Sequence, residues 1–413
     1  MSGRNVCVTP AQLQRTPLGV PFAPGFEDTY YSASGGLAQA RQVFLAGNGL
    51  PERWRGRDSF TILETGFGLG LNFLAAWDLL RADPQGPARL HFVSVERHPF
   101  AARDLAEALA PFEELRPLAN ALVATWPPPI AGFHRLQFDG GRVQLTLMAG
   151  DARELLPQLE ASADAIFLDG FSPARNPEMW SPEVVRELAR VAAPGATLAT
   201  WTVAGGVRAA LTGAGFRIEK REGFGNKREM LAGHREGEPA SARRPARKAL
   251  IVGAGLAGTL VAERLASRGW EVGLVDEREK RTGATVGLVR PIANLRDAVN
   301  AQASRPAFLY AMQHFRALQH LCEFGGQSLE DRRGYACGGQ NAIPCTRLPT
   351  GQSRIGHRRH TRQMLRTLRV CNGDGAKSTA FDMPANRWYA AEQDLNTATK
   401  DVGYCLRIAP VGD

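Results

Sequence analysis

The 413-residue sequence has no run of eighteen or more apolar residues, and its first residues lack the apolar core of a signal peptide. Cysteine is sparse, with six residues, of which only Cys7 precedes position 320, and no C-x-x-C pair occurs. A zinc knuckle or thioredoxin-type motif is therefore not indicated, and a site built from the later cysteines with His357 and His360 is a minor alternative. We expect a soluble, cytoplasmic protein without a membrane segment or a metal.

Acidic residues are in deficit. The chain has 41 Asp and Glu against 50 Lys and Arg, a formal net charge of +9. Such an excess suits a polyanionic partner such as a nucleic acid, because neutralised phosphates release counterions. It also suits a merely basic enzyme, so charge alone leaves both readings open. The length exceeds one ordinary domain and predicts two, and the sequence indicates no particular oligomeric state.

Short apolar runs alternate with helical patterns from Phe60 onwards, whereas residues 1–58 look irregular. This alternation is typical of an α/β fold with a parallel, Rossmann-like sheet. We expect helices at 71–82 and 182–193, among others. The expected strands are 60–64, 90–95, 143–148, 164–168 and 196–201, with a final pair at about 215–220 and 226–232.

Changes in composition suggest the domain boundaries. A first domain covers 1–235, and the polar, basic stretch 236–247 reads as a linker. A second α/β unit opens abruptly at Lys248, and regularity ends near residue 320. Within 321–413, the stretch 332–373 holds nine arginines and no acidic residue. We therefore expect 248–320 to be a partial domain and 321–413 to be an irregular tail, disordered or read out of frame.

The segment E-T-G-F-G-L-G at 64–70 joins an expected strand to an expected helix. Its glycines, Gly66, Gly68 and Gly70, allow a sharp turn and a close approach of the backbone to a ligand. The spacing is G-x-G-x-G, which differs from the dinucleotide pattern. The carboxylate of Glu64 at the strand end favours a cationic or hydroxyl-bearing ligand over a pyrophosphate.

Two further carboxylates follow the next strands. Glu96 is placed to accept hydrogen bonds from ribose hydroxyls, and Asp151 to hold an adenine amine. The carboxyl ends of parallel strands share one edge of the sheet, which is where such folds bind ligands. One acid there could be a helix cap, but three in successive units with the glycine loop predict S-adenosylmethionine.

The fourth strand ends in L-D-G-F-S-P-A-R-N-P-E-M-W, and Asp169 emerges beside the predicted cofactor. Methyl transfer to an amine needs an uncharged lone pair on the nitrogen, which a carboxylate can orient and deprotonate. We therefore predict Asp169 as the catalytic group, although Asp169-Gly170 could simply form a turn. Arg175, Lys227 and Arg228 are candidate phosphate contacts, and each alone could be a solvated surface charge.

A second glycine loop, L-I-V-G-A-G-L-A-G at 250–258, follows an apolar strand and opens a helix. The glycines Gly253, Gly255 and Gly258 complete a G-x-G-x-x-G pattern, and the next strand ends in Asp276. Together these parts predict a dinucleotide-binding βαβ unit. Asp276 disfavours the 2′-phosphate of NADP, whereas the motif itself does not separate FAD from NAD.

Long strings of this sequence resemble one bacterial family, the tRNA 5-methylaminomethyl-2-thiouridine biosynthesis bifunctional proteins. The resemblance rests on DTYYSASGGL, VFLAGNGLPERW, ETGFGLGLNF, LDGFSPARNPEMW, AAPGATLATWTVAGGVR and GFGNKREM. It continues through 248–275 and thinly to about 316. Leu69 departs from it, because the family usually has Thr there.

The resemblance implies two reactions on the wobble uridine of tRNA. A C-terminal FAD module removes a carboxymethyl group, and the N-terminal module methylates the exposed amine with S-adenosylmethionine. It implies Asp169 as the catalytic aspartate, and cofactor roles for both glycine loops, Glu64, Glu96, Asp151 and Asp276. The family's oxidase module is longer than the residues present, so we expect a truncated or frameshifted, inactive one. Two alternatives are a flavin amine oxidase of small molecules and a non-catalytic tRNA-binding protein.

Overall fold

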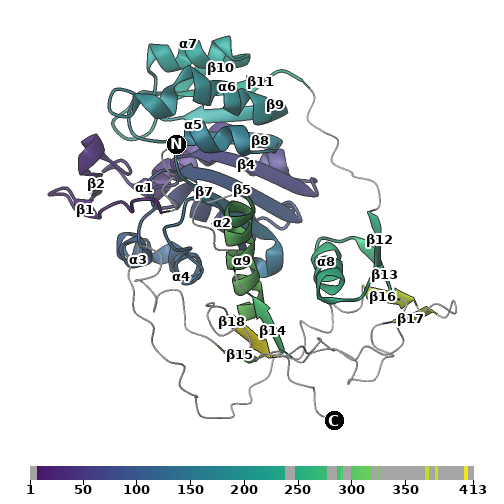
Figure 1. The fold of residues 1–413 in the computed structure, drawn as a ribbon. Helices are drawn as coiled ribbons and strands as arrows, with labels where there is room; N and C mark the ends of the chain where they lie inside the picture. Colours follow the sequence, from purple (N-terminus) through teal and green to yellow (C-terminus); the bar gives the residue numbers. More distant parts are fainter. Residues whose placement is uncertain are drawn as a thin grey trace. The chain divides into compact units, whose positions relative to one another are not determined.

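The computed structural model describes residues 7–237 and 247–276, with the short segments 286–289, 291, 299–317, 323–325, 368–371, 377–379 and 404–407 (Figure 1). The chain divides into two compact units, Met1–Arg243 with Ala293–Tyr310, and Arg244–Ile292 with Ala311–Asp413. No helix among the described residues is both long and apolar enough to cross a membrane.

An eight-stranded sheet forms the centre of the first unit (Figure 1). In their order across the sheet, the strands are β10 (Phe216–Glu222), β11 (Glu229–Arg235), β9 (Ala192–Thr200), β8 (Ala163–Leu168), β4 (Ser59–Thr65), β5 (Arg89–Glu96), β7 (Val143–Ala149) and β6 (Gly132–Phe138). The five central strands, β9, β8, β4, β5 and β7, run parallel, and β6, β10 and β11 pair antiparallel with their neighbours. The predicted α/β class with a Rossmann-like sheet is confirmed.

The chain changes direction across the sheet at β4. From β4 it proceeds outward to β5 and then to β6 at the edge, and β7 fills the place between β5 and β6. It then returns to place β8 on the other side of β4. Loops that follow β4 and β8 therefore leave the same edge of the sheet towards opposite faces. Ligands in open α/β sheets bind at such a switch point, so the topology places the site between these two loops.

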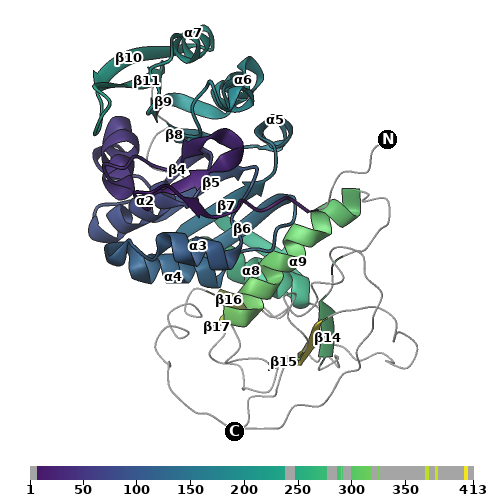
Figure 2. The same cartoon turned by 90° about the vertical axis from the view of Figure 1, so that its left-hand side faces the viewer.

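Alternate side chains of the strands pack on opposite faces of the sheet, because the side-chain period of a strand is two. In β4, Phe60 and Ile62 join one buried cluster and Leu63 joins the other. The first cluster includes helices α2 (Leu71–Ala82), α3 (Ala102–Leu109) and α4 (Arg116–Ala124), and the second includes α5 (Ala152–Leu155), α6 (Pro182–Val191) and α7 (Gly205–Gly213). Figure 2 shows the sheet between these two helix layers.

Several element boundaries differ from those expected. The strand β11 was expected from 226 but starts at Glu229, because a turn closes with a hydrogen bond from Gly223 N to Arg228 O. Helix α6 ends at Val191 instead of 193, because β9 begins at Ala192, where it pairs with Ala163 before a bulge. The strand β6 was not predicted at all.

Residues 7–58 are more ordered than the sequence suggests. They form a small antiparallel sheet of β1 (Gln14–Arg15), β2 (Pro21–Ala23) and β3 (Asp28–Thr29). Helix α1 (Gly36–Gln39) continues into a π-helical turn, Ala40–Leu45, and short 3₁₀ turns follow. Phe44 and Trp54 are fully buried in the first cluster, as their bulk would suggest, so this segment is part of the domain core.

The second unit contains the predicted strand–helix–strand motif. Strand β12 (Lys248–Val252) pairs in parallel with β13 (Glu271–Val275), and α8 (Leu256–Ala266) connects them. Helix α9 (Val299–Ala317) is divided between the two units at Tyr310. The further elements of the second unit are the strands β14 (Val286–Val289), β15 (Glu323–Gly325), β16 (Leu368–Cys371), β17 (Lys377–Thr379) and β18 (Tyr404–Arg407). The last four fall within the predicted irregular tail, most of which lies outside the described residues.

Candidate functional site

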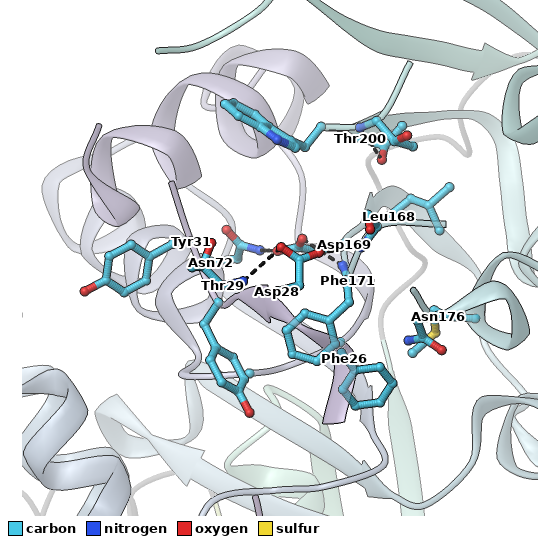
Figure 3. Close-up of a pocket in the computed structure, with 18 of the residues that line it drawn as sticks. Phe26, Asp28, Thr29, Tyr31, Asn72, Leu168, Asp169, Phe171, Asn176 and Thr200 are labelled. Carbon is cyan, nitrogen blue, oxygen red and sulfur yellow. Dashed lines mark hydrogen bonds between the residues drawn. The ribbon is translucent and has the colours of Figure 1, made fainter. Parts of the chain in front are cut away.

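A pocket of about 440 Å³ opens at the carboxyl edge of the sheet, beside the loops that follow β4 and β8. Aromatic and carboxylate side chains from distant parts of the first unit line it (Figure 3). Of the predicted site residues, those that line it are Gly66, Gly68, Glu96, Asp151, Asp169 and Lys227. Its volume and mixed lining are those of a small-molecule site.

The glycine loop has the backbone conformation that its composition predicts. Gly66, Gly68 and Gly70 all have positive φ, at 75°, 52° and 73°. A Cβ on Gly66 would lie 3.2 Å from Cα of Gly170, and one on Gly70 would lie 2.6 Å from the ring of Phe67. Glycine is therefore required both by the backbone angle and by the close neighbours.

Glu96 fixes the glycine loop from the neighbouring strand. Its Oε2 accepts a hydrogen bond from Gly68 N at 2.9 Å, and its Oε1 accepts one from His98 N at 2.8 Å. Each carboxylate oxygen has a second lone pair available, so Glu96 can also accept from hydroxyl groups of a ligand in the pocket. The position agrees with its predicted role at a ribose.

Asp151 caps α5 and carries a strong ion pair. It accepts from Arg153 N at 2.9 Å and from the Arg153 guanidinium at 2.8 and 3.1 Å, and Arg97 lies 3.8 Å away. The hydrogen bond from the Arg153 side chain, above all, holds the pKa of Asp151 below its usual value. The predicted cofactor contact is thus an ionised acceptor on the pocket wall, and also the helix cap that the sequence left as an alternative.

Glu64 is not in the pocket lining. The residue is 1% exposed, and its carboxylate accepts from Ser94 Oγ at 2.6 Å and from Asn72 Nδ2 at 2.9 Å. Burial raises its pKa well above the usual value, and these two hydrogen bonds only partly offset the effect. The structure therefore places Glu64, like Gly70, outside the pocket lining.

Asp169 lies at the end of β8, directly across from the glycine loop. Its Oδ1 accepts from Gly170 N at 2.8 Å, and its Oδ2 accepts from Asn72 Nδ2 at 2.8 Å; Figure 3 shows this pair within the pocket. Thr65 Oγ1 donates to the main-chain oxygen of Asp169 at 2.6 Å and joins the two loops. Burial raises the pKa of Asp169 to about 6, despite the two hydrogen bonds to its carboxylate.

The sequence did not single out Asn72, the second residue of α2. The only local signal was its place in the first turn of the helix after the glycine loop, on the side that faces the sheet, where it is buried. Its amide nitrogen donates to both Glu64 and Asp169, which lie 8 and 97 positions away. A second missed residue, Asp28, accepts from Ser172 N at 2.9 Å and brings the N-terminal segment to the pocket.

Aromatic rings surround the carboxylates. The rings of Phe26 and Phe171 stack with centroids 4.5 Å apart, and Tyr30 meets Phe171 edge-on at 5.2 Å. Burial, with a smaller effect from Glu96, raises the pKa of Tyr30, so this residue stays a neutral phenol. The Trp180 indole donates to Phe171 O at 2.8 Å and fixes the loop after Asp169.

The three predicted phosphate contacts differ in their surroundings. Lys227 lies at the pocket, with Nζ 4.9 Å from the centroid of the Trp201 ring and 3.4 Å from Trp201 O. Burial lowers the pKa of Lys227, and the charge of Asp28 opposes this. Arg175 forms an ion pair with Glu27, and Arg228 is exposed; neither lines the pocket.

The second glycine loop lies in the other unit. Gly253 has φ of 98°, and a Cβ on Gly258 would lie 1.8 Å from Gly253 O, so only glycine fits at that crossing of helix and strand. Gly255 is the N-cap of α8. Asp276 follows β13, and its Oδ2 accepts from Ala254 N at 2.6 Å, which brings the acidic residue against the loop. No group of three His, Cys, Asp or Glu residues in the described parts of the chain could hold a metal.

The chain matches a family described as S-adenosyl-L-methionine-dependent methyltransferase over residues 113–236. It is 55% identical over 318 residues to the tRNA 5-methylaminomethyl-2-thiouridine biosynthesis bifunctional protein MnmC of Aromatoleum aromaticum, covering 75% of this chain and 50% of that protein. The protein of the same name from an Azoarcus species is 53% identical over 321 residues, covering 76% and 50%. The chain thus spans about half the length of these curated relatives.

Among solved structures, MNMC2 from Aquifex aeolicus is similar with a TM-score of 0.46 and 22% identity, over 57% of this chain and 73% of that one. The matches confirm the predicted S-adenosylmethionine-dependent methyltransferase domain and the resemblance to the bifunctional family. They favour neither a free-standing small-molecule oxidase nor a non-catalytic RNA-binding protein.

Proposed function

We propose that this chain, a relative of the bifunctional tRNA-modifying proteins, methylates the amine of 5-aminomethyl-2-thiouridine in tRNA with S-adenosylmethionine. The observation that carries the proposal is the position of Asp169, which lies in the pocket across from the glycine loop with both carboxylate oxygens oriented by donors. The name of these two relatives supports the product, 5-methylaminomethyl-2-thiouridine. The net charge of +9 suits an RNA substrate, and we propose the cytoplasm as its compartment.

The pocket suits the methyl donor. Positive-φ glycines at 66 and 68 let the backbone approach a ligand without Cβ interference. Glu96 and Asp151 both line the pocket, and they would accept from the ribose hydroxyls and from the adenine amine. When bound, the donor supplies an electrophilic methyl group. Gly70 and Glu64 would support this site from behind, since neither lines the pocket.

Asp169 would prepare the substrate amine. The nitrogen must be uncharged to attack, and then forms its bond to the methyl carbon as the carbon–sulfur bond breaks and sulfur leaves as a thioether. The proton that the nitrogen loses passes to the Asp169 carboxylate, whose pKa near 6 keeps it ionised at pH 7 yet basic enough to accept. Phe26, Tyr30 and Phe171 would exclude water around the reacting amine.

Three cations, Lys227, Arg228 and Arg175, would contact phosphate groups of the tRNA. Lys227 is the strongest of the three, because its ammonium lies at the pocket rim near Trp201. Arg228 follows it on the exposed turn before β11, where a phosphate could reach both. Arg175 would need to exchange Glu27 for a phosphate.

For the second unit we propose part of an FAD-binding module, with domain limits of 1–235, 236–247, 248–320 and 321–413 for the chain. Gly253, Gly255, Gly258 and Asp276 fit the adenosine end of a dinucleotide, because the loop opens a helix and the acid lies beside it. A bound flavin would supply oxidative chemistry, which the family resemblance assigns to removal of a carboxymethyl group.

The test is methyl transfer from methyl-labelled S-adenosylmethionine to tRNA that carries 5-aminomethyl-2-thiouridine. We expect label at the wobble nucleoside with the native chain, and a loss of about 100-fold or more in rate with Asp169→Asn. Asp58→Asn is the matched control, because Asp58 is exposed at the amino end of β4, opposite the site. Cofactor binding without transfer to this tRNA would contradict the proposal and point to a different amine.

A further inference from the structure

Two carboxylates share one amide nitrogen beneath the pocket. Asn72 Nδ2 donates to Glu64 Oε1 at 2.9 Å and to Asp169 Oδ2 at 2.8 Å, so both of its protons are used. Ser94 Oγ holds the other oxygen of Glu64 at 2.6 Å. The result is a continuous chain of hydrogen bonds, Ser94–Glu64–Asn72–Asp169, that runs from a buried strand to the pocket.

Within this series of hydrogen bonds, the position of Glu64 differs from the one that its motif predicts. As the acid of the glycine motif it is expected to face the cofactor, yet it is fully buried, and the pocket lining does not include it. Asn72 and Ser94 are its hydrogen-bond donors, no salt bridge from the described residues reaches it, and a buried carboxylate in such surroundings favours its neutral form. A protonated Glu64 keeps one oxygen to accept from Asn72 and can donate its proton to Ser94 Oγ.

We propose that Asn72 is the positioning residue of Asp169 and that Glu64 anchors Asn72, without contacting the methyl donor. The inference rests on the proposed role of Asp169 as the base. Gly170 N and Asn72 Nδ2 each fix one carboxylate oxygen, which leaves a lone pair of each for the substrate amine. Asn72 itself lines the pocket wall and would exclude water from the oxygen that it holds.

The amide also sets how basic Asp169 is. The hydrogen bond from Asn72 lowers the pKa of Asp169, against burial and the charges of Glu96 and Asp28, which raise it. Removal of this donor therefore moves the pKa upwards, and the base becomes protonated at a higher pH. A side chain with a purely structural role would change stability and leave this ionisation where it is.

The first experiment measures single-turnover methyl transfer against pH for the full chain, together with the Kd for S-adenosylmethionine. For Asn72→Ala we expect a rate at pH 7 that is lower by about tenfold or more, an acidic limb moved to higher pH, and a Kd within about threefold of the native value. Asn120→Ala, an exposed asparagine on α4, is the matched control.

Glu64→Gln tests whether Glu64 anchors Asn72 or binds the methyl donor through its charge. Glutamine has the shape of protonated glutamate, accepts from Asn72 and can donate to Ser94, so we expect rate and Kd within about twofold of native. Glu64→Leu removes the anchor and should reproduce the shifted limb of Asn72→Ala. A tenfold weaker Kd with Glu64→Gln, or an unshifted limb with Asn72→Ala, overturns the inference. If Asn72→Ala does not fold, the two Glu64 variants decide.

Failure of the proposed function gives a different result. If the native chain transfers no methyl group to tRNA, the aspartate carboxyl carbons can be titrated by ¹³C NMR, with Asp169→Asn assigning the signal. The inference then still requires a higher pKa for Asp169 in Asn72→Ala than in the native chain. An equal pKa in both would overturn it independently of any substrate.

Discussion

The main-chain amide of Ser172 donates a 2.9 Å hydrogen bond to Oδ2 of Asp28, which lies 144 positions earlier in the chain. The stacked rings of Phe26 and Phe171 add an apolar contact beside it. Together they hold the N-terminal segment against the loop that carries Asp169. One wall of the pocket therefore comes from residues that precede the sheet altogether.

We predict that Asp28→Ala lowers kcat/KM for tRNA about tenfold, because a charge-assisted hydrogen bond of this kind contributes about 1.5–3 kcal/mol. Asp28→Asn keeps an acceptor oxygen for Ser172 and should retain most of the activity. Steady-state methylation assays on both variants test this. Equal losses in the two would show that the charge of Asp28, and not its link to Ser172, is what matters.

Gly66→Ala should abolish measurable binding of S-adenosylmethionine. A side chain there costs about 1–2 kcal/mol through the left-handed backbone alone, and its Cβ also approaches Cα of Gly170 at 3.2 Å. Gly56→Ala is a close control, because Gly56 has φ of 72° with open space around it. Calorimetric titration should therefore show native affinity for Gly56→Ala and none for Gly66→Ala, with a lower Tm for both.

Ionised Asp169 should destabilise the fold. Burial raises its pKa from 3.8 to about 6, so the folded chain binds this proton more tightly than the unfolded chain. The stabilisation that this bound proton contributes is fully present below pH 3.8 and is lost as the pH rises through about 6. Since Asp169 is partly exposed, we expect Asp169→Asn to gain about 1–2 kcal/mol at pH 7.5.

The gain should shrink at pH 4.5, where the native carboxyl is already mostly protonated. Thermal unfolding of the native chain and of Asp169→Asn at the two pH values measures it. A Tm difference that is the same at both would contradict the raised pKa. A gain confined to neutral pH would mean that keeping Asp169 ionised as a base lowers the stability of this domain.

Lys227→Ala should weaken tRNA binding and reduce the slope of log Kd against log salt by about 1, as expected for the loss of one phosphate contact. Lys227 is at the pocket rim beside Trp201. Arg186→Ala, which removes an exposed cation from α6, should leave both quantities unchanged. A native slope with Lys227→Ala would remove this residue from the RNA interface.

The sequence predicted the parts of the site that depend on local order. The glycine loop and Glu96 follow buried strands directly, so their place at the carboxyl edge could be read from the pattern alone. Asn72 and Asp28 could not, because their partners lie 97 and 144 positions away. The glycine motif predicted that Glu64 faces the cofactor. In the structure Glu64 instead points inward and accepts a hydrogen bond from Ser94.

The missed strand β6 had a signal. Its residues alternate in burial, with His134, Leu136 and Phe138 inside, and D-G-G at 139–141 before β7 takes up positive φ at each position, as in a hairpin turn. The chain beyond residue 320 gave no periodic pattern, and the described strands there are three or four residues long. Strands this short leave no period to detect.

The order of the strands also bears on synthesis. Of the eight strands of the first sheet, β11 is the last to leave the ribosome. It is an interior strand that pairs with both β9 and β10, and Lys227 just before it reaches the pocket. A nascent chain that ends before Lys227 thus lacks both an inner strand of the sheet and part of the pocket lining. Binding of the methyl donor would then report that translation of the whole first domain is complete, before the second unit has emerged.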